Sequence, residues 1–256
     1  MVKDKRILVT GMSGLIGGIA GRKLMKKYEV RALNRRDVPG VETFQADITD
    51  LEAIRPSFKD VDIVVHMAAY LGNGNTPEQI NVNIWGTYNV FEAAREAGVK
   101  RIVFGSSGAV MHNYERDEPY KALVEARYHD IAESIPMLTH LSPTRPNSLY
   151  GCAKLWGEAL GRYYAEDYGI SVLCIRLGRV VEEDKPYDAR HAAVYLSHRD
   201  TAQIIEKCVE APDDLMYDIF YGISDNRTRF RDLVHARDVI GFIPQDGIRT
   251  WPEEDA

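Results

Sequence analysis

Residues 7–17 read Ile7-Leu-Val-Thr10-Gly11-Met-Ser13-Gly14-Leu15-Ile16-Gly17, an apolar run that breaks into three regularly spaced glycines. The run is typical of a buried parallel strand, and Ile19 and Leu24 continue at helical spacing. In a strand–turn–helix unit the first glycine makes the turn, the second admits a pyrophosphate, and the third lets the helix pack on the strand. The helix N-terminus then attracts the phosphates. An ordinary turn is the alternative, but the pattern predicts a dinucleotide site formed by Gly11, Ser13, Gly14, Leu15, Ile16 and Gly17.

The second predicted strand, residues 29–34, bears on which dinucleotide is bound. In such folds an acidic residue about 20 positions past the first glycine holds the adenosine ribose. Here that position holds Asn34, followed by Arg35 and Arg36. An asparagine can still bond a ribose hydroxyl, but paired guanidinium groups suit a 2′-phosphate better. The residues therefore favour NADP over NAD, although two solvated arginines would leave the preference open.

Five further apolar runs predict strands, and most of the segments between them have helical spacing. The runs are residues 44–48, 61–69, 101–107, 170–177 and 216–221. Such alternation predicts an α/β fold, a Rossmann-type doubly wound parallel sheet with helices on both faces. The alternation loosens late in the chain. We therefore expect a dinucleotide-binding domain at 1–176 and a small C-terminal substrate-binding lobe at 177–256, packed together as one structural unit.

Open α/β sheets bind their ligands at the carboxyl ends of the strands, so the residues at those ends are candidates for the site. Asp47 and Ile48 end the third run, and Ala68 and Ala69 leave space at the end of the fourth. Ser107 ends the fifth. Its hydroxyl can donate to a substrate oxygen or cap the following turn.

Tyr150 and Lys154 stand four residues apart at the start of a helix that Asn147 or Ser148 is expected to cap. Positions i and i+4 share a helix face, so both side chains can enter one cleft. We expect the cation to lower the pKa of the phenol from ~10, which would let Tyr150 exchange a proton with a substrate hydroxyl or carbonyl. Alone the spacing is a weak signal, because both residues are common on helix surfaces.

Composition argues against several classes of protein. The net charge is −6, the pI is about 5.7, and the basic residues form no long block, so nucleic acid and anionic membranes are poor candidate partners. We find no signal peptide and no apolar run that could span a bilayer. The three cysteines lack metal-ligand spacing, so we expect reduced thiols, no metal and a cytoplasmic location. The broad apolar stripe of the Tyr150 helix predicts a homodimer.

Several motifs, taken in their order along the chain, resemble the extended short-chain dehydrogenase/reductases, also called the NAD-dependent epimerase/dehydratase family. These motifs are Thr10-Gly-x-x-Gly-x-x-Gly17, Ala68-Ala69, Asn83 ahead of Gly86-Thr87, Ser106-Ser107 and Tyr150-x-x-x-Lys154. Within the family the chain is most similar to uronate dehydrogenases. The shared segments are Ser197-His-Arg-Asp200, Gly222-Ile-Ser-Asp-Asn226 and Gly241-Phe-Ile-Pro-Gln-Asp246.

The resemblance implies roles for individual residues. Ser107, Tyr150 and Lys154 would be the catalytic set, and Tyr150 and Lys154 would also bind the cofactor. Asp47, Ala68 and Asn83 would contact or frame the cofactor. Arg190 would fall where uronate dehydrogenases bind the substrate carboxylate, and the candidate substrate-binding residues are Ser107, Gly108, Arg179 and Arg190.

The chain also departs from the uronate dehydrogenase pattern. Gly108-Ala109 replaces Asn-His, Arg179 stands where a small polar residue is expected, and Asn34-Arg35 replaces the acidic ribose ligand. Residues 112–141 are longer than their counterpart, and we expect an irregular loop there with at most one helical turn, of the kind that serves as a lid or binding loop. These departures imply a changed substrate and unchanged chemistry.

The sequence supports one function more than two others. The first is an NAD(P)-dependent dehydrogenase that acts on a small, sugar-like and possibly acidic substrate. The second is a sugar epimerase or dehydratase, which uses the same hydride step and regenerates its cofactor in place. The third is a dinucleotide sensor without catalysis, against which the intact Ser107, Tyr150 and Lys154 argue.

Overall fold

The computed structural model describes residues 5–72, 74–131 and 134–249. Its parallel strands form one sheet in the order β3-β2-β1-β4-β5-β6-β7. The strands are β1 (Arg6–Thr10), β2 (Glu29–Asn34), β3 (Glu42–Gln45), β4 (Ile63–His66), β5 (Arg101–Ser107), β6 (Ser171–Leu177) and β7 (Tyr217–Gly222). The strand order reverses between β1 and β4, and sheets of this kind bind ligands in the crevice at that reversal.

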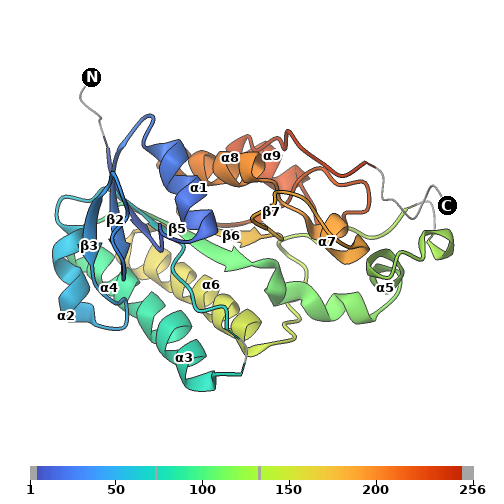
Figure 1. Ribbon diagram of the computed structural model, residues 1–256, viewed down its shortest axis with the longest axis horizontal. Helices are drawn as coiled ribbons and strands as arrows, with labels where there is room; N and C mark the ends of the chain where they lie inside the picture. The colour runs from blue at the N-terminus through green and yellow to red at the C-terminus, as the bar shows by residue number, and fades with distance from the viewer. Residues whose placement is uncertain (1–4, 73, 132–133, 250–256) are drawn as a thin grey trace.

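Helices cover both faces of the sheet (Figure 1). One layer holds α1 (Leu15–Leu24), α8 (His198–Val209) and α9 (Val234–Ile240), and the other holds α2 (Leu51–Ile54), η1 (Arg55–Phe58), α4 (Thr87–Glu96) and α6 (Leu149–Tyr168). An apolar cluster fills the space under each layer. Because both faces are covered, a strand can be apolar along its length, and Ile7, Leu8 and Val9 of β1 are fully buried. The predicted doubly wound parallel sheet is confirmed.

The described part of the predicted C-terminal lobe, residues 177–249, contributes a strand to the sheet itself. β7 pairs with β6 from Val172↔Tyr217 to Leu177↔Gly222, and α8 packs against α1. The segment between β6 and α8 contains α7 (Ala189–Val194) and runs near the carboxyl ends of the strands. The role of this part of the chain in substrate binding remains a prediction.

The segment 112–141 contains more regular structure than the sequence predicts. It holds most of the 3-10 helix η3 (Gly108–Arg116), then α5 (Tyr120–Val124) and η4 (Tyr128–Asp130), and residues 132–133 lie outside the described residues. The prediction of a largely irregular loop is therefore wrong. The physical reason is a third apolar cluster, in which Tyr120 and Leu123 pack against Phe230 from the far end of the chain.

The helical segment between β4 and β5 is divided into three parts. These are α3 (Thr76–Ile80), the π-helix η2 (Asn81–Gly86) and α4. A π-helical turn inserts an extra residue, and such turns occur often at functional sites. None of the described helices combines the length and the apolarity that are needed to cross a membrane.

Candidate active site

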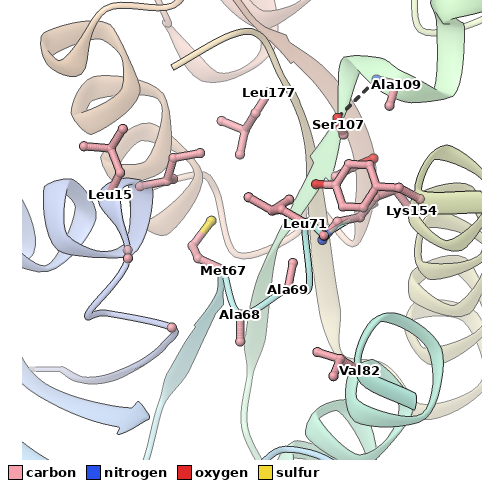
Figure 2. Close-up of a pocket in the computed structure, with 18 of the residues that line it drawn as sticks. Leu15, Met67, Ala68, Ala69, Leu71, Val82, Ser107, Ala109, Lys154 and Leu177 are labelled. Atoms are coloured by element: carbon pink, nitrogen blue, oxygen red, sulfur yellow. Dashed lines mark hydrogen bonds between the residues drawn. The ribbon is translucent and has the colours of Figure 1, made fainter. Parts of the chain in front are cut away.

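A cavity of about 900 Å³ lies at the carboxyl edge of the sheet. Figure 2 shows Leu15 of α1 on one side of it, Ser107 and Lys154 on the other, and Met67, Ala68 and Ala69 between them. The predicted residues that line the cavity are Gly11, Ser13, Gly14, Leu15, Ile16, Gly17, Asn34, Arg35, Arg36, Asp47, Ile48, Ala68, Ala69, Ser107, Gly108, Tyr150, Lys154, Arg179 and Arg190. Asn83 is the predicted site residue that does not line it.

The glycine turn has the shape that a pyrophosphate requires. Gly11 has φ +69°, and a Cβ there would lie 2.7 Å from Ala68 Cα. A Cβ on Gly17 would lie 2.3 Å from the carbonyl oxygen of Gly11, so only glycine allows α1 to start this close to the turn. Gly14 caps α1 without a side-chain hydrogen bond, which leaves first-turn N–H groups free for phosphate oxygens. The residues present therefore fit a dinucleotide.

Asn34 braces this turn from the end of β2. Its Oδ1 accepts a hydrogen bond from Ser13 N at 3.4 Å, and its Nδ2 donates one to the carbonyl of Arg36 at 2.9 Å. The side chain of Arg35 is 74% exposed and lies 4.0 Å from a carboxylate oxygen of Asp47. This end of the cavity thus offers guanidinium groups, and the carboxylate of Asp47 lies at some distance from the first of them.

Asn83 acts from behind the cavity wall. It is buried in η2, where its Oδ1 accepts from Tyr70 N at 2.8 Å and its Nδ2 donates to Tyr70 O at 2.9 Å. The same Nδ2 donates to Gln79 Oε1 at 2.6 Å, and Gln79 does line the cavity. Asn83 therefore fixes the loop that follows β4, which agrees with a framing role better than with direct cofactor contact.

Ser107 ends β5 and also caps η3. Its Oγ accepts a hydrogen bond from Ala109 N at 3.1 Å, which Figure 2 marks with a dashed line. Because that bond uses a lone pair, the hydroxyl proton remains available for donation. Tyr150 lines the same cavity, and the Ser107 hydroxyl favours a lower pKa of its phenol. The structure therefore brings the two predicted catalytic hydroxyls together.

The helix α6 places Tyr150 and Lys154 as the sequence predicts. Ser148 is its N-cap, and its Oγ accepts from Gly151 N at 3.2 Å. Lys154 is almost fully buried, and its Nζ lies 4.9 Å from the centre of the Phe104 ring and 5.7 Å from that of Tyr150. The ammonium group thus contacts aromatic ring faces as well as the cavity.

The expectation that Lys154 lowers the pKa of Tyr150 is wrong for this geometry. Burial raises the pKa of Tyr150 to about 12, and the Ser107 hydroxyl only partly opposes that effect. Burial also lowers the pKa of Lys154 to about 8, because the cation loses its water. Tyr150 is therefore protonated at neutral pH and suited to donate a proton to a substrate oxygen.

The shifted pKa of Lys154 should be measurable as pH-dependent stability. The unfolded chain holds this proton up to pH ~10.4 and the folded chain only to about 8, so unfolding takes up protons between these values and stability rises with pH there. Each pKa unit corresponds to about 1.4 kcal/mol. We expect Lys154→Met to raise the free energy of unfolding without cofactor, in urea titrations at pH 7, by up to roughly 3 kcal/mol. That advantage should shrink toward pH 10, and a constant difference would contradict the shift.

Arginine side chains line the end of the cavity next to Gly108. Arg190, at the start of α7, donates through Nε to Glu115 of η3 at 2.5 Å. Arg179 is exposed and donates to the hydroxyl of Tyr187 at 3.3 Å. Both lie where the sequence places the substrate, and their charges suit an anionic group.

Several residues that were not predicted from the sequence also line the cavity. Among them are Gln79, His112 and Arg231. Arg231 is 1% exposed, and its Nη2 donates to the carbonyl of Gly108 at 3.3 Å. Burial lowers the pKa of His112 to about 4, so it is neutral near pH 7. No local motif marks these residues, because long-range contacts bring them to the cavity.

One group of possible metal ligands lies outside the residues that line the cavity. His140, Asp218 and His235 bring ligand atoms within 4.8 Å of one another. However, the two imidazole rings stack, with centroids 3.7 Å apart and 18° between their planes. Imidazole binds a metal through a lone pair in the ring plane, and stacked rings do not direct these lone pairs at one ion. His235 Nε2 instead pairs with Asp218 Oδ1 at 2.8 Å, and we assign the cluster no metal.

Comparison with known proteins gives one family. Residues 7–243 match the model of the NAD dependent epimerase/dehydratase family. The chain is 32% identical to an NAD-dependent glucose-6-phosphate dehydrogenase of Haloferax volcanii, over 95% of this chain and 94% of that protein. It is 33% identical to an L-arabinose 1-dehydrogenase (NAD(P)(+)) of the same organism, over 97% and 99% of the two chains.

A solved structure is also similar. The glucuronic acid dehydrogenase of Chromohalobacter salexigens has a TM-score of 0.81 and 30% identity, covering 98% of this chain and 88% of that one. Glucuronic acid is a uronic acid, so the resemblance to uronate dehydrogenases is confirmed. The match to the family model and the extent of these similarities lead to one conclusion: the chain belongs to the NAD dependent epimerase/dehydratase family.

Proposed function

We propose that this protein is an NAD(P)-dependent dehydrogenase that oxidises a carbon bearing a hydroxyl group in a small anionic sugar, or reduces the corresponding carbonyl. One observation carries the proposal. The side chains of Ser107 and Tyr150 line one cavity, together with a glycine turn that fits a dinucleotide and arginine residues that suit an anion. The named activities of the relatives support the same class of reaction.

Each residue of the set has a distinct task in this proposal. The cofactor supplies or accepts a hydride at the substrate carbon. Ser107 donates a hydrogen bond to the substrate oxygen and fixes its position, because its own oxygen already accepts from Ala109 N. Tyr150 gives its proton to that oxygen in reduction. In oxidation the phenol first loses its own proton to solvent and then takes the proton of the substrate hydroxyl. The buried ammonium of Lys154 would hold a hydroxyl of the nicotinamide ribose when the cofactor is bound.

A substrate panel tests the proposal. Aldoses, uronates and sugar phosphates are assayed with NAD and with NADP in both directions, and the change in cofactor absorbance is compared with the amount of product. We expect one mole of reduced cofactor for each mole of sugar oxidised. An epimerase or dehydratase would form product without net reduction, and a sensor would bind cofactor without forming product.

We propose NADP as the preferred cofactor. Arg35 and Arg36 line the cavity at the position where a ribose 2′-phosphate would lie, and Asp47 is 4.0 Å from Arg35. Arg35→Ala should weaken NADP binding by about 10-fold, the loss of one charge-assisted hydrogen bond, and leave NAD binding nearly unchanged. Equal losses for the two cofactors in a fluorescence titration would make Arg35 a solvated surface residue. Arg22→Ala is the control, because Arg22 is an exposed arginine on α1 that does not line the cavity.

We also propose a homodimer in the cytoplasm. Trp85 of η2 and Tyr163 and Tyr168 of α6 are 58%, 46% and 44% exposed, and η2 packs against α6. A second subunit could cover this aromatic surface. Light scattering of the wild type and of Trp85→Arg tests the dimer.

The proposal of a cytoplasmic location rests on the cysteines. All three are free thiols, as expected for a reducing compartment.

A further inference from the structure

Arg231 is a buried cation with few partners in the described part of the chain. Its side chain is 1% exposed, yet it lines the cavity. Nη2 donates to Gly108 O at 3.3 Å and lies 4.0 Å from Glu115, while the buried Nε has no hydrogen-bond partner. A guanidinium group has five N–H donors, and a buried charge is costly unless it is paired. Arg231 is therefore equipped for a further anionic partner.

The position of Arg231 is fixed by the backbone around it. Leu138 N donates to Phe230 O at 2.8 Å, and Asp232 N donates to Leu138 O at 2.9 Å, so residues 230–232 are held on one side by a neighbouring segment. On the other side the guanidinium group fills the space over Gly108, where a Cβ would lie 2.2 Å from Nη1. Because the guanidinium group of Arg231 is already fixed beside Gly108, it loses little conformational entropy when it binds a ligand.

The charges at this end of the cavity do not balance. Three arginine side chains line it, Arg179, Arg190 and Arg231, and Glu115 pairs with two of them from behind at 2.5 and 4.0 Å. His112 is neutral near pH 7. Three guanidinium groups and one carboxylate leave a net charge of +2. A carboxylate would neutralise half of that charge, whereas a phosphate monoester, with a charge near −2 at pH 7, would neutralise all of it.

We propose that Arg231 is a specificity-determining residue that binds, together with Arg190 and Arg179, a dianionic phosphate group of the sugar substrate. This inference rests on the proposed dehydrogenase function and narrows its substrate to phosphorylated sugars. The phosphate would accept hydrogen bonds from the unpaired N–H groups of Arg231 and from the Nη groups that the Glu115 pair leaves free on Arg190. Glu115 would then orient both guanidinium groups without binding the ligand.

The test uses three sugars that share one ring and differ in charge: glucose, glucuronate and glucose 6-phosphate. For the wild type we expect kcat/KM to increase in that order. Arg231→Gln should lower the ratio of kcat/KM for the phosphate to that for the uronate by about 10- to 100-fold, the effect of losing one charge-assisted hydrogen bond. Its kcat/KM with glucose should fall by much less than its kcat/KM with the phosphate, because glucose carries no anionic group. Arg231→Lys, which keeps a charge but not the planar fork, should lie between.

Arg229→Gln is the matched control. Arg229 precedes Arg231 by two residues, pairs with Asp225 and does not line the cavity, so this change removes the same charge outside the proposed site. It should behave as the wild type. A wild type that prefers glucuronate, or an Arg231→Gln variant that loses activity equally with all three sugars, would overturn the inference. The second result would make Arg231 a structural residue.

A binding measurement separates this inference from the proposed function. With saturating NADP present, inorganic phosphate should raise the Tm of the wild type and of Arg229→Gln, and should not raise that of Arg231→Gln. If phosphate has this effect but none of the sugars is oxidised, the anion site stands and the dehydrogenase proposal fails. If a sugar is oxidised but phosphate raises no Tm, the dehydrogenase stands and the phosphate site is wrong.

Discussion

Tyr150→Phe is expected to lower kcat by about 10²–10⁴-fold, the usual contribution of a positioned proton donor or acceptor. The change removes one oxygen and almost no volume, so α6 and the cavity should keep their shape. The affinity for the cofactor should stay within about twofold, because the proposed ribose contact belongs to Lys154 rather than to the phenol. Steady-state rates and fluorescence titration of the cofactor measure the two effects separately.

Tyr163→Phe is the control for this prediction. Tyr163 lies on the same helix, is 46% exposed and shares a hydrogen bond with Tyr168 at 2.9 Å, away from the cavity. Removal of the Tyr163 hydroxyl group should leave kcat unchanged. Ser107→Ala should also lower kcat, since it removes the proposed donor for the substrate oxygen. A Tyr150→Phe enzyme that kept more than a few per cent of wild-type activity would remove Tyr150 from the catalytic set.

The sequence predicted those features of the site that depend on short-range pattern. The glycine turn was recognisable because its three glycines and the strand before it lie within 11 residues, and the same local geometry then requires Gly11 and Gly17 in the structure. Apolar periodicity predicted that a strand ends at Ser107. The same periodicity and the capping residue Ser148 predicted that a helix begins near Tyr150. Topology then brings these ends to one edge of the sheet.

The features that depend on tertiary contacts were not predicted. Arg231 bonds to Gly108 across 123 residues of sequence, and no spacing rule links them. The segment 112–141 looked irregular because it is polar, yet Tyr120 and Leu123 find an apolar partner in Phe230. The pKa of Tyr150 was predicted in the wrong direction because it depends on burial, which the i, i+4 spacing of Tyr150 and Lys154 does not reveal.

The second large effect is expected at Arg190, which should distinguish charged from neutral substrates. Arg190→Ala should raise KM for an anionic sugar by about 10- to 100-fold, at tenfold for each ~1.4 kcal/mol of lost binding. A neutral sugar should be affected little. The reason is geometric: Glu115 holds Nε at 2.5 Å, which fixes the guanidinium group and leaves its two terminal amino groups for a planar or tetrahedral anion.

Two further variants decide whether Arg190 contacts the substrate or only holds Glu115. Glu115→Gln removes the counter-charge and keeps the size of the side chain. If Arg190 binds the anion, this variant should lower KM for the charged sugar or leave it unchanged, because one negative charge near the ligand is lost. If Arg190 only holds Glu115, Arg190→Ala and Glu115→Gln should disturb the cavity equally, and each should raise KM for charged and neutral sugars alike. Arg116→Ala, an exposed change at the end of η3, should alter neither constant. A best substrate that proves to be neutral would reject the anionic assignment and leave the hydride chemistry of Ser107 and Tyr150 as the remaining proposal.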